Sequence, residues 1–184
     1  YLEKLLAPNA SEIFTLSLTN ICDYEVGFDV IERSNIMREG FEEGIMPPST
    51  GWETISLGTT EEVWEVRSTA NYVDEGQFAA WVGYDMDEQS NEWLLSPVID
   101  PGTLSDLSLT FRAFSSTENF RNATMKVWVT DENGDVLTDF SPDPLWDSLR
   151  DENWGLYFYR TVFVDLSDFA GYASPIRIAW QYIG

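Results

Sequence analysis

A short acidic segment in the first half of the chain has the residue types of a metal site. Asp85, Asp87, Glu88 and Asn91 lie close together in one segment that we expect to form a loop between two strands. Carboxylate and amide oxygens are the ligands that Ca²⁺ prefers, and acids at positions i and i+2 of a loop can turn toward one point. The spacing is not that of an EF-hand. The segment is either a calcium site or a solvated acidic loop, and both interpretations stay open.

Four aromatic residues in a polar, turn-rich stretch are candidates for contact with a glycan. They are Trp146, Trp154, Tyr157 and Tyr159. Exposed aromatic rings on one face of a sandwich could bind sugar rings. Packing in the core is the alternative, because large aromatic side chains stabilise a protein most when they are buried.

Charge and composition exclude several classes of function. The 184 residues include 10 Lys and Arg and 32 Asp and Glu, which gives a formal net charge of −22. That charge argues against nucleic acid and anionic membrane as partners, because both attract positive potential. The chain has no His, which removes Ser-His-Asp and Cys-His catalysis and every His-ligated metal site. Pairs of carboxylates could serve a glycosidase, but 32 acids form such pairs by chance, so we expect no enzyme.

Apolar residues alternate with polar ones along most of the chain, which predicts an all-β fold. We expect strands over residues 62–67, 77–84, 92–99, 107–114, 125–130, 157–166 and 176–183. Asn133 and Gly134 favour a tight hairpin within Asp131–Asp135, and one short helix is expected around Pro144–Arg150. Many short strands separated by turns are typical of a sandwich or jelly roll. We expect its core to contain Trp93, Leu95, Phe111, Val127, Phe163 and Ile178.

The first 37 residues are expected to belong to a different unit. Ser11–Thr19 and Glu25–Glu32 alternate and predict a hairpin, and the polar segment Arg33–Gly40 is typical of a linker. Two strands alone are marginally stable in water, so this hairpin belongs to a larger module. The chain begins with Tyr1 rather than Met, and we expect it to be a piece of a longer precursor. No segment approaches the roughly 20 apolar residues of a membrane-spanning helix, so no membrane insertion is expected.

Five segments in a fixed order resemble a known family of domains. Phe41–Trp52 contains Phe-Glu, Pro-Pro and Gly-Trp pairs, and Gly76–Trp81 leads to Asn91–Asp100 with its Trp-Leu-Leu-Ser-Pro run. Val164–Gly171 and Ile176–Tyr182 follow as a later pair. In this order they resemble choice-of-anchor J domains and the related cleaved-adhesin domains of gingipain-type bacterial proteases, and more loosely MAM domains.

The resemblance implies a jelly-roll β-sandwich over residues 38–184, preceded by the end of an Ig-like module in residues 1–37. Members of the family often carry structural Ca²⁺, and Glu42, which follows the opening Phe41, is by resemblance a ligand. The family usually continues into one more strand. The chain is therefore expected to lack its last strand, and an open edge of this kind can accept a strand from a neighbour.

The expected function is that of a non-catalytic, calcium-stabilised module of a secreted or cell-surface protein, serving adhesion or assembly. Its expected partners are other domains of the same polypeptide and a cell-surface protein or glycan. One alternative is a substrate- or carbohydrate-binding accessory domain of a secreted protease or glycosidase. The other is a structural subunit of a surface filament or layer.

Overall fold

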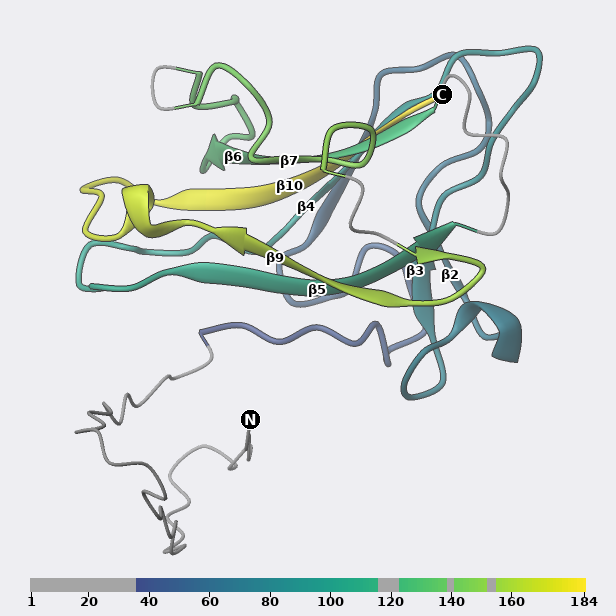
Figure 1. Cartoon of the computed structure of the whole chain (residues 1–184), viewed down its shortest axis with the longest axis horizontal. Coiled ribbons are helices and arrows are strands. Elements are labelled where there is room, and N and C mark those ends of the chain that lie inside the picture. Colours follow the sequence, from purple (N-terminus) through teal and green to yellow (C-terminus); the bar gives the residue numbers. More distant parts are fainter. Residues whose placement is uncertain (1–35, 116–122, 139–140, 152–154) are drawn as a thin grey trace, which may run out of the picture. The chain divides into compact units, whose positions relative to one another are not determined.

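The computed structural model describes residues 36–115, 123–138, 141–151 and 155–184 (Figure 1). The chain divides into two units, Tyr1–Met37 and Arg38–Gly184, and the second contains all the strands described below. The predicted hairpin strands Ser11–Thr19 and Glu25–Glu32 lie outside the described residues, as does the first part of the predicted linker. A preceding Ig-like module therefore stays a prediction.

The second unit is built from short strands, as the alternating pattern predicts. The strands are β1 (Glu53–Ser56), β2 (Glu65–Arg67), β3 (Ala79–Trp81), β4 (Asn91–Leu95), β5 (Ser108–Ser115), β6 (Thr124–Asp131), β7 (Trp146–Asp147), β8 (Gly155–Leu156), β9 (Arg160–Asp165) and β10 (Ile176–Ile183). Two single 3-10 turns, Ala70–Tyr72 and Ser167–Phe169, are the helical elements of the described residues. None of the helices described is long and apolar enough to cross a membrane.

Two sheets form the layers of the sandwich, and β2 pairs with β3 in a separate two-stranded sheet. The larger sheet has the strand order β1-β4-β10-β6-β7, so that β10 lies at its centre and pairs with β4 and β6. The smaller sheet has the order β8-β5-β9, with β5 antiparallel to β9. Figure 1 shows the larger sheet lying over β5 and β9. The predicted all-β jelly-roll sandwich is confirmed at the level of fold class.

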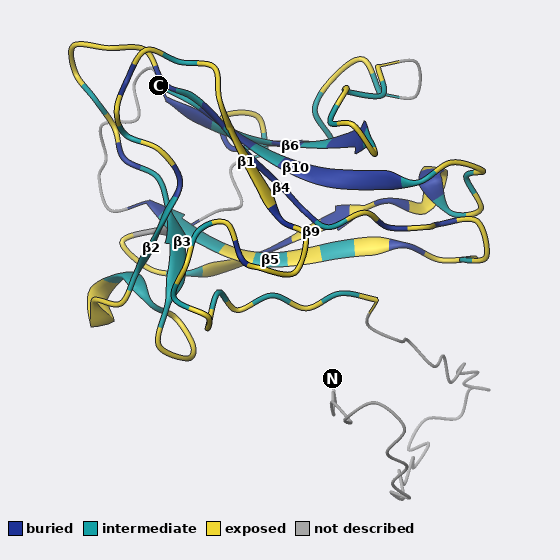
Figure 2. Cartoon of the chain, turned by 180° about the vertical axis from the view of Figure 1, so that it is seen from behind, coloured by how far each residue is buried: buried dark blue, intermediate teal, exposed yellow. Residues whose placement is uncertain are grey.

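Aromatic side chains join the two layers. The ring of Phe111 on β5 meets Trp146 on β7 edge-on at 5.5 Å and Trp180 on β10 edge-on at 6.0 Å. Trp52, just before β1, stacks on Trp180 at 5.8 Å. Edge-to-face pairs contribute about 0.5–1.5 kcal/mol each beyond the area that they bury. Much of β10 is accordingly buried (Figure 2).

Four of the six predicted core residues lie in the interior. Leu95, Val127 and Ile178 are almost fully buried, and Phe111 lies between the sheets. Leu95 lies on the outer face of the larger sheet, and the predicted hairpin Asp131–Asp135 covers it there. At Gly134 of this hairpin φ is +95°, and a Cβ atom there would stand 3.0 Å from the Leu95 side chain. Glycine thus allows both the turn and its close approach to the sheet.

The other two predicted core residues are wrong. Phe163 is 57% exposed, because Val162 and Val164 of β9 point into the core and successive side chains of a strand point to opposite faces. Trp93 is only partly buried, because its neighbours Glu92 and Leu94 take the inward positions of β4. In both strands the larger side chain occupies the outward position.

The short helix predicted around Pro144–Arg150 is also wrong. Trp146 and Asp147 form β7, which pairs with β6 through Val127 and Lys126. A turn follows, in which the amides of residues 150 and 151 donate to the Asp147 carbonyl. So short a segment cannot easily nucleate a helix, and burying the Trp146 ring against Phe111 favours the strand.

Replacing an aromatic ring at the centre of the sandwich should lower the free energy of unfolding far more than replacing an exposed ring. We expect Trp146→Ala to lower the free energy of unfolding by about 3–5 kcal/mol, because Trp146 is 2% exposed. The matched control Phe163→Ala should change it by less than about 0.5 kcal/mol. Urea denaturation of both variants measures the difference, and equal losses would contradict the assignment of the two rings.

Candidate functional site

Glu42, Asp85 and Asn91, three of the five residues predicted to bind calcium, accept hydrogen bonds from protein donors. The carboxylate of Glu42 accepts hydrogen bonds from the backbone N–H groups of Gln77, at 3.1 Å to both oxygens, and of Phe78, at 3.4 Å. These hydrogen bonds stabilise the turn at Gly76. There φ is +77°, and a Cβ atom would clash with the carboxylate of Glu42. It therefore fixes a loop of the chain, and its oxygens already have partners.

The Asp85–Asn91 loop does not gather its oxygens around one point. Asp85 accepts a hydrogen bond from the backbone of Asp87 at 2.8 Å and one from the Thr60 hydroxyl at 3.4 Å. Asp87 and Glu88 are exposed. Asn91 belongs to β4, and its carbonyl oxygen is occupied by two donors, as described below. Across the described residues no three Asp, Glu, Cys or His side chains gather as metal ligands, so the predicted calcium ligands do not form a ready-made site.

Three of the four aromatic residues predicted to contact a glycan lie in the described part of the chain, and those three do not share a surface. Trp146 is in the core, so its predicted contact with a glycan is wrong. Trp154 lies outside the described residues. The ring of Tyr159 packs 4.6 Å from Phe114 and its hydroxyl donates to the Tyr72 carbonyl at 2.7 Å; burial raises the pKa of Tyr159 to about 12. Tyr157 is 60% exposed and, of the three that the structure describes, is the one that presents its ring to solvent.

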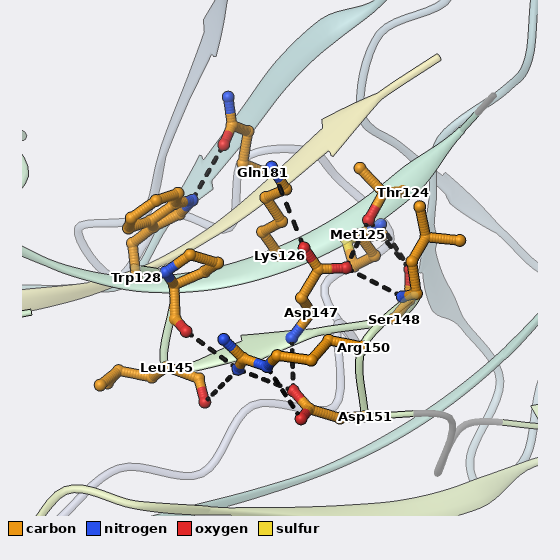
Figure 3. Close-up of polar contacts among 12 residues, drawn as sticks. Thr124, Met125, Lys126, Trp128, Leu145, Asp147, Ser148, Arg150, Asp151 and Gln181 are labelled. Atoms are coloured by element: carbon orange, nitrogen blue, oxygen red, sulfur yellow. Dashed lines mark hydrogen bonds and ion pairs between the residues drawn. The ribbon is translucent and has the colours of Figure 1, made fainter. Parts of the chain in front are cut away.

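A different pair of tryptophans lies on the outer face of the larger sheet. Trp93 on β4 donates its indole N–H to the side-chain oxygen Oδ1 of Asn91 at 2.9 Å, and Trp128 on β6 donates its own to the side-chain oxygen Oε1 of Gln181 at 2.9 Å. The Gln181 amide on β10 donates to the same Asn91 oxygen at 2.9 Å. A continuous chain of hydrogen bonds thus joins the two indoles across three strands. Figure 3 shows the Trp128 end of this chain.

Charged side chains flank these indoles in pairs. The Lys126 ammonium is 4.0 Å from Asp147, whose carboxylate also accepts from the Thr124 hydroxyl at 2.9 Å (Figure 3). Arg150 holds Asp151 through two hydrogen bonds, of 3.0 and 2.8 Å. These contacts come from β6, β7 and the turn that follows, so one corner of the sheet carries balanced charge in a strongly acidic chain.

A third pair joins β10 to β1. The guanidinium of Arg177 donates to Glu53 at 2.7 Å and is buried, while Glu53 is exposed. The Nε and Nη1 atoms of Arg177 find no acceptor among the described residues. Glu53 is accordingly the one charged group that is described as bonded to this buried cation.

The sequence pattern did not predict this outer face. Its signal is the order of residues in β4, where the acidic Glu92 takes an inward position and Trp93 an outward one. Glu92 is 1% exposed and accepts a hydrogen bond from the Ser56 hydroxyl at 2.9 Å. An acid inside and a tryptophan outside reverse the usual pattern of a half-buried strand.

Comparison with known proteins defines the fold. No protein-family model matches the sequence, and no curated protein matches it. Among solved structures, the chain is similar to the K1 cleaved adhesin domain of Lys-gingipain from Porphyromonas gingivalis W83, with a TM-score of 0.51 and 19% identity. The match covers 79% of this chain and 90% of that one. The fold resembles a cleaved-adhesin β-sandwich.

The cleaved-adhesin resemblance in the sequence is thus supported at the level of the fold. At 19% identity the similarity supports a shared fold and does not extend to a shared function. The choice-of-anchor J and MAM resemblances stay predictions, as does the calcium ligand that they imply.

Calcium binding can be tested by thermal melting. The chain carries a net charge of −22, and cation binding to the folded state would reduce its self-repulsion and raise the melting temperature. We expect a higher melting temperature in millimolar CaCl₂ than in chelator at matched ionic strength, and a smaller gain in the variant Asp85→Asn. Equal melting temperatures in the two buffers would reject the prediction.

Lowering the pH should remove the stability that the carboxylate of Asp151 contributes to the fold. The bidentate hydrogen bond from Arg150, followed by the backbone N–H of Asp147, lowers the pKa of Asp151 below its usual value of 3.8. A carboxyl with a lowered pKa stabilises the fold above its unfolded pKa, and this stability is lost as the pH falls through the folded pKa.

The variant Asp151→Asn tests this assignment. We expect it to be less stable than the wild type at pH 6, and we expect the difference to shrink as the pH falls below about 4. Asp168→Asn, which removes one exposed carboxylate elsewhere, is the matched control. Urea denaturation at several pH values gives the difference, and a gap for Asp151→Asn that stays constant with pH would refute the assignment.

Proposed function

We propose that this chain is a non-catalytic β-sandwich module of a larger secreted or cell-surface protein and that it serves adhesion or assembly. The observation that carries the proposal is the similarity of its fold to a domain described as a cleaved adhesin, over 79% of this chain and 90% of that one. The absence of His from the whole sequence supports a non-catalytic role, because His is the commonest general base.

Assembly with a neighbour is a second form of the same role, and the exposed edge of the larger sheet favours it. All four residues of β1 are exposed, and within the described residues β1 pairs with β4 alone. An unpaired strand edge can accept a strand from another chain or from another domain of the same polypeptide. An accessory domain of a secreted protease or glycosidase would use the same fold and would differ in its parent chain.

Adhesion and catalysis give different results in one pair of assays. Beads coated with the 184-residue chain should be retained on cultured cells or on surfaces coated with extracellular-matrix proteins, whereas beads coated with albumin should not. The purified chain should leave a panel of peptides and glycans uncleaved over hours. Turnover of any substrate, or retention no better than that of albumin on every surface, would overturn the proposal.

A further inference from the structure

We propose that the outer face of the larger sheet binds a neutral glycan, with Trp93 and Trp128 as the rings on which sugar units stack. We call Asn91, Trp93, Lys126, Trp128 and Gln181 the tryptophan face. The inference rests on the proposed function, because it assigns the surface through which adhesion would occur. Its evidence is independent, since it comes from side chains on the sheet rather than from the fold.

The strand registers place these side chains on one face. Trp93 pairs with Gln181, and Gln181 pairs with Lys126, so the three form one row across β4, β10 and β6. Trp128 lies in the next row, opposite Ala179. The two tryptophans are therefore two strands apart, roughly 10 Å in the direction across the sheet, and one row apart along it. This spacing suits separate units of an oligosaccharide better than a single sugar.

Both indoles are held in place before any ligand arrives. Each indole N–H is the donor of a hydrogen bond, one to Asn91 and the other to Gln181, and these two amides are bonded to each other. What each ring can still offer a ligand is its apolar π surface, against which the C–H face of a sugar ring packs. Fixed side chains lose little conformational entropy on binding, which favours affinity.

Polar groups for sugar hydroxyls lie between the rings. Among the hydrogen bonds of the described residues, none uses the two N–H groups of the Asn91 side-chain amide, which is partly exposed. The Gln181 amide uses one of its two N–H groups but is only 8% exposed, so its role is to hold Asn91 and Trp128 in place. The Lys126 ammonium is partly exposed beside Asp147. Amide donors and a cation set beside aromatic rings match the alternating apolar faces and hydroxyl edges of a pyranose.

The balance of charge favours a neutral ligand. The chain carries −22 overall, yet each cation around this face is matched by an acid: Lys126 with Asp147, Arg150 with Asp151 and Arg177 with Glu53. The face therefore provides no excess positive charge for a phosphate, a sulfated glycan or an anionic membrane.

A protein partner fits this face less well. The core of a protein interface is usually an apolar patch that contains hydrophobic anchors. Here the residues between the rings are amides and a charged pair, and the apolar Leu95 and Ala179 of the same face are 1% and 0% exposed. Ile55, opposite Trp93 on β1, is the aliphatic side chain beside the rings and is 37% exposed. One aliphatic side chain beside two rings separated by polar groups is suited to a ligand whose faces are small and whose edges are polar.

Affinity electrophoresis of the complete chain tests the inference. Native gels contain hydroxyethyl cellulose, glucomannan, galactomannan or dextran as neutral probes, with alginate as the anionic comparison. We expect at least one neutral polysaccharide to retard the wild type. Trp93→Ala and Trp128→Ala should each weaken this interaction by roughly tenfold or more, as for a ring at a binding hot spot.

Two kinds of control separate binding from folding. Phe163→Ala removes an exposed ring elsewhere and should leave the retardation unchanged. Gln181→Met preserves side-chain volume but removes the acceptor of the Trp128 indole and one of the donors to Asn91, so it should weaken binding while the circular dichroism spectrum stays that of the wild type. If Trp128→Ala unfolds, Trp128→Phe takes its place and should weaken binding with the fold intact.

The outcomes decide between the two proposals. Absence of retardation by every neutral probe, retardation by alginate alone, or unchanged retardation in folded tryptophan variants would overturn the glycan site. Cell adhesion that persists in those variants would overturn it too, while leaving the proposed function in place. Capture of a purified matrix protein that depends on Trp93 and Trp128, with no polysaccharide bound, would show that the face binds protein and would also refute the inference.

Discussion

The contact of Phe111 with Trp146 and Trp180 is the interaction on which the sandwich depends. The three rings come from β5, β7 and β10, and they meet edge-to-face at 5.5 and 6.0 Å. They join the centre of the larger sheet to the smaller one. Once Trp180 is inside, alternation along β10 forces Gln181 to the outer face, and the registers with β4 and β6 then place Trp93 outside as well. The core contact therefore fixes the composition of the opposite face.

Acidic side chains hold many of the loops that connect these strands. Glu43 accepts from the amide and hydroxyl of Ser49, Asp131 from the amides of Asn133 and Asp135, and Asp165 from the amide of Ser167. These hydrogen bonds lower the pKa of all three carboxyls. Backbone N–H groups thus offset part of the negative charge of these carboxylates. The same use of oxygens explains why clustered acids in the sequence do not converge as metal ligands.

The alternating pattern was sufficient for the fold class and for most strands, because burial of one face imposes a period of two. It predicted β10 and the turn at Gly134 correctly. It failed where a contact distant in the sequence decides the outcome. Pro144–Arg150 has a weak local preference, and pairing of Trp146 with β6 makes it a strand. The loops likewise depend on contacts between residues far apart in the sequence, such as that of Glu42 with Gln77, and a local sequence pattern cannot predict these contacts.

The side of a strand that faces the core is the hardest property to obtain from the sequence, and β4 shows why. Hydrophobicity alone would turn Trp93 inward and Glu92 outward. The structure does the reverse, and it satisfies the buried acid with Ser56 and the outward indole with Asn91. A local conflict with the usual pattern that persists in a folded chain costs stability, and such conflicts are expected at functional sites. The outward indole of Trp93 is a departure of this kind, and it is a physical reason for proposing a ligand at the tryptophan face.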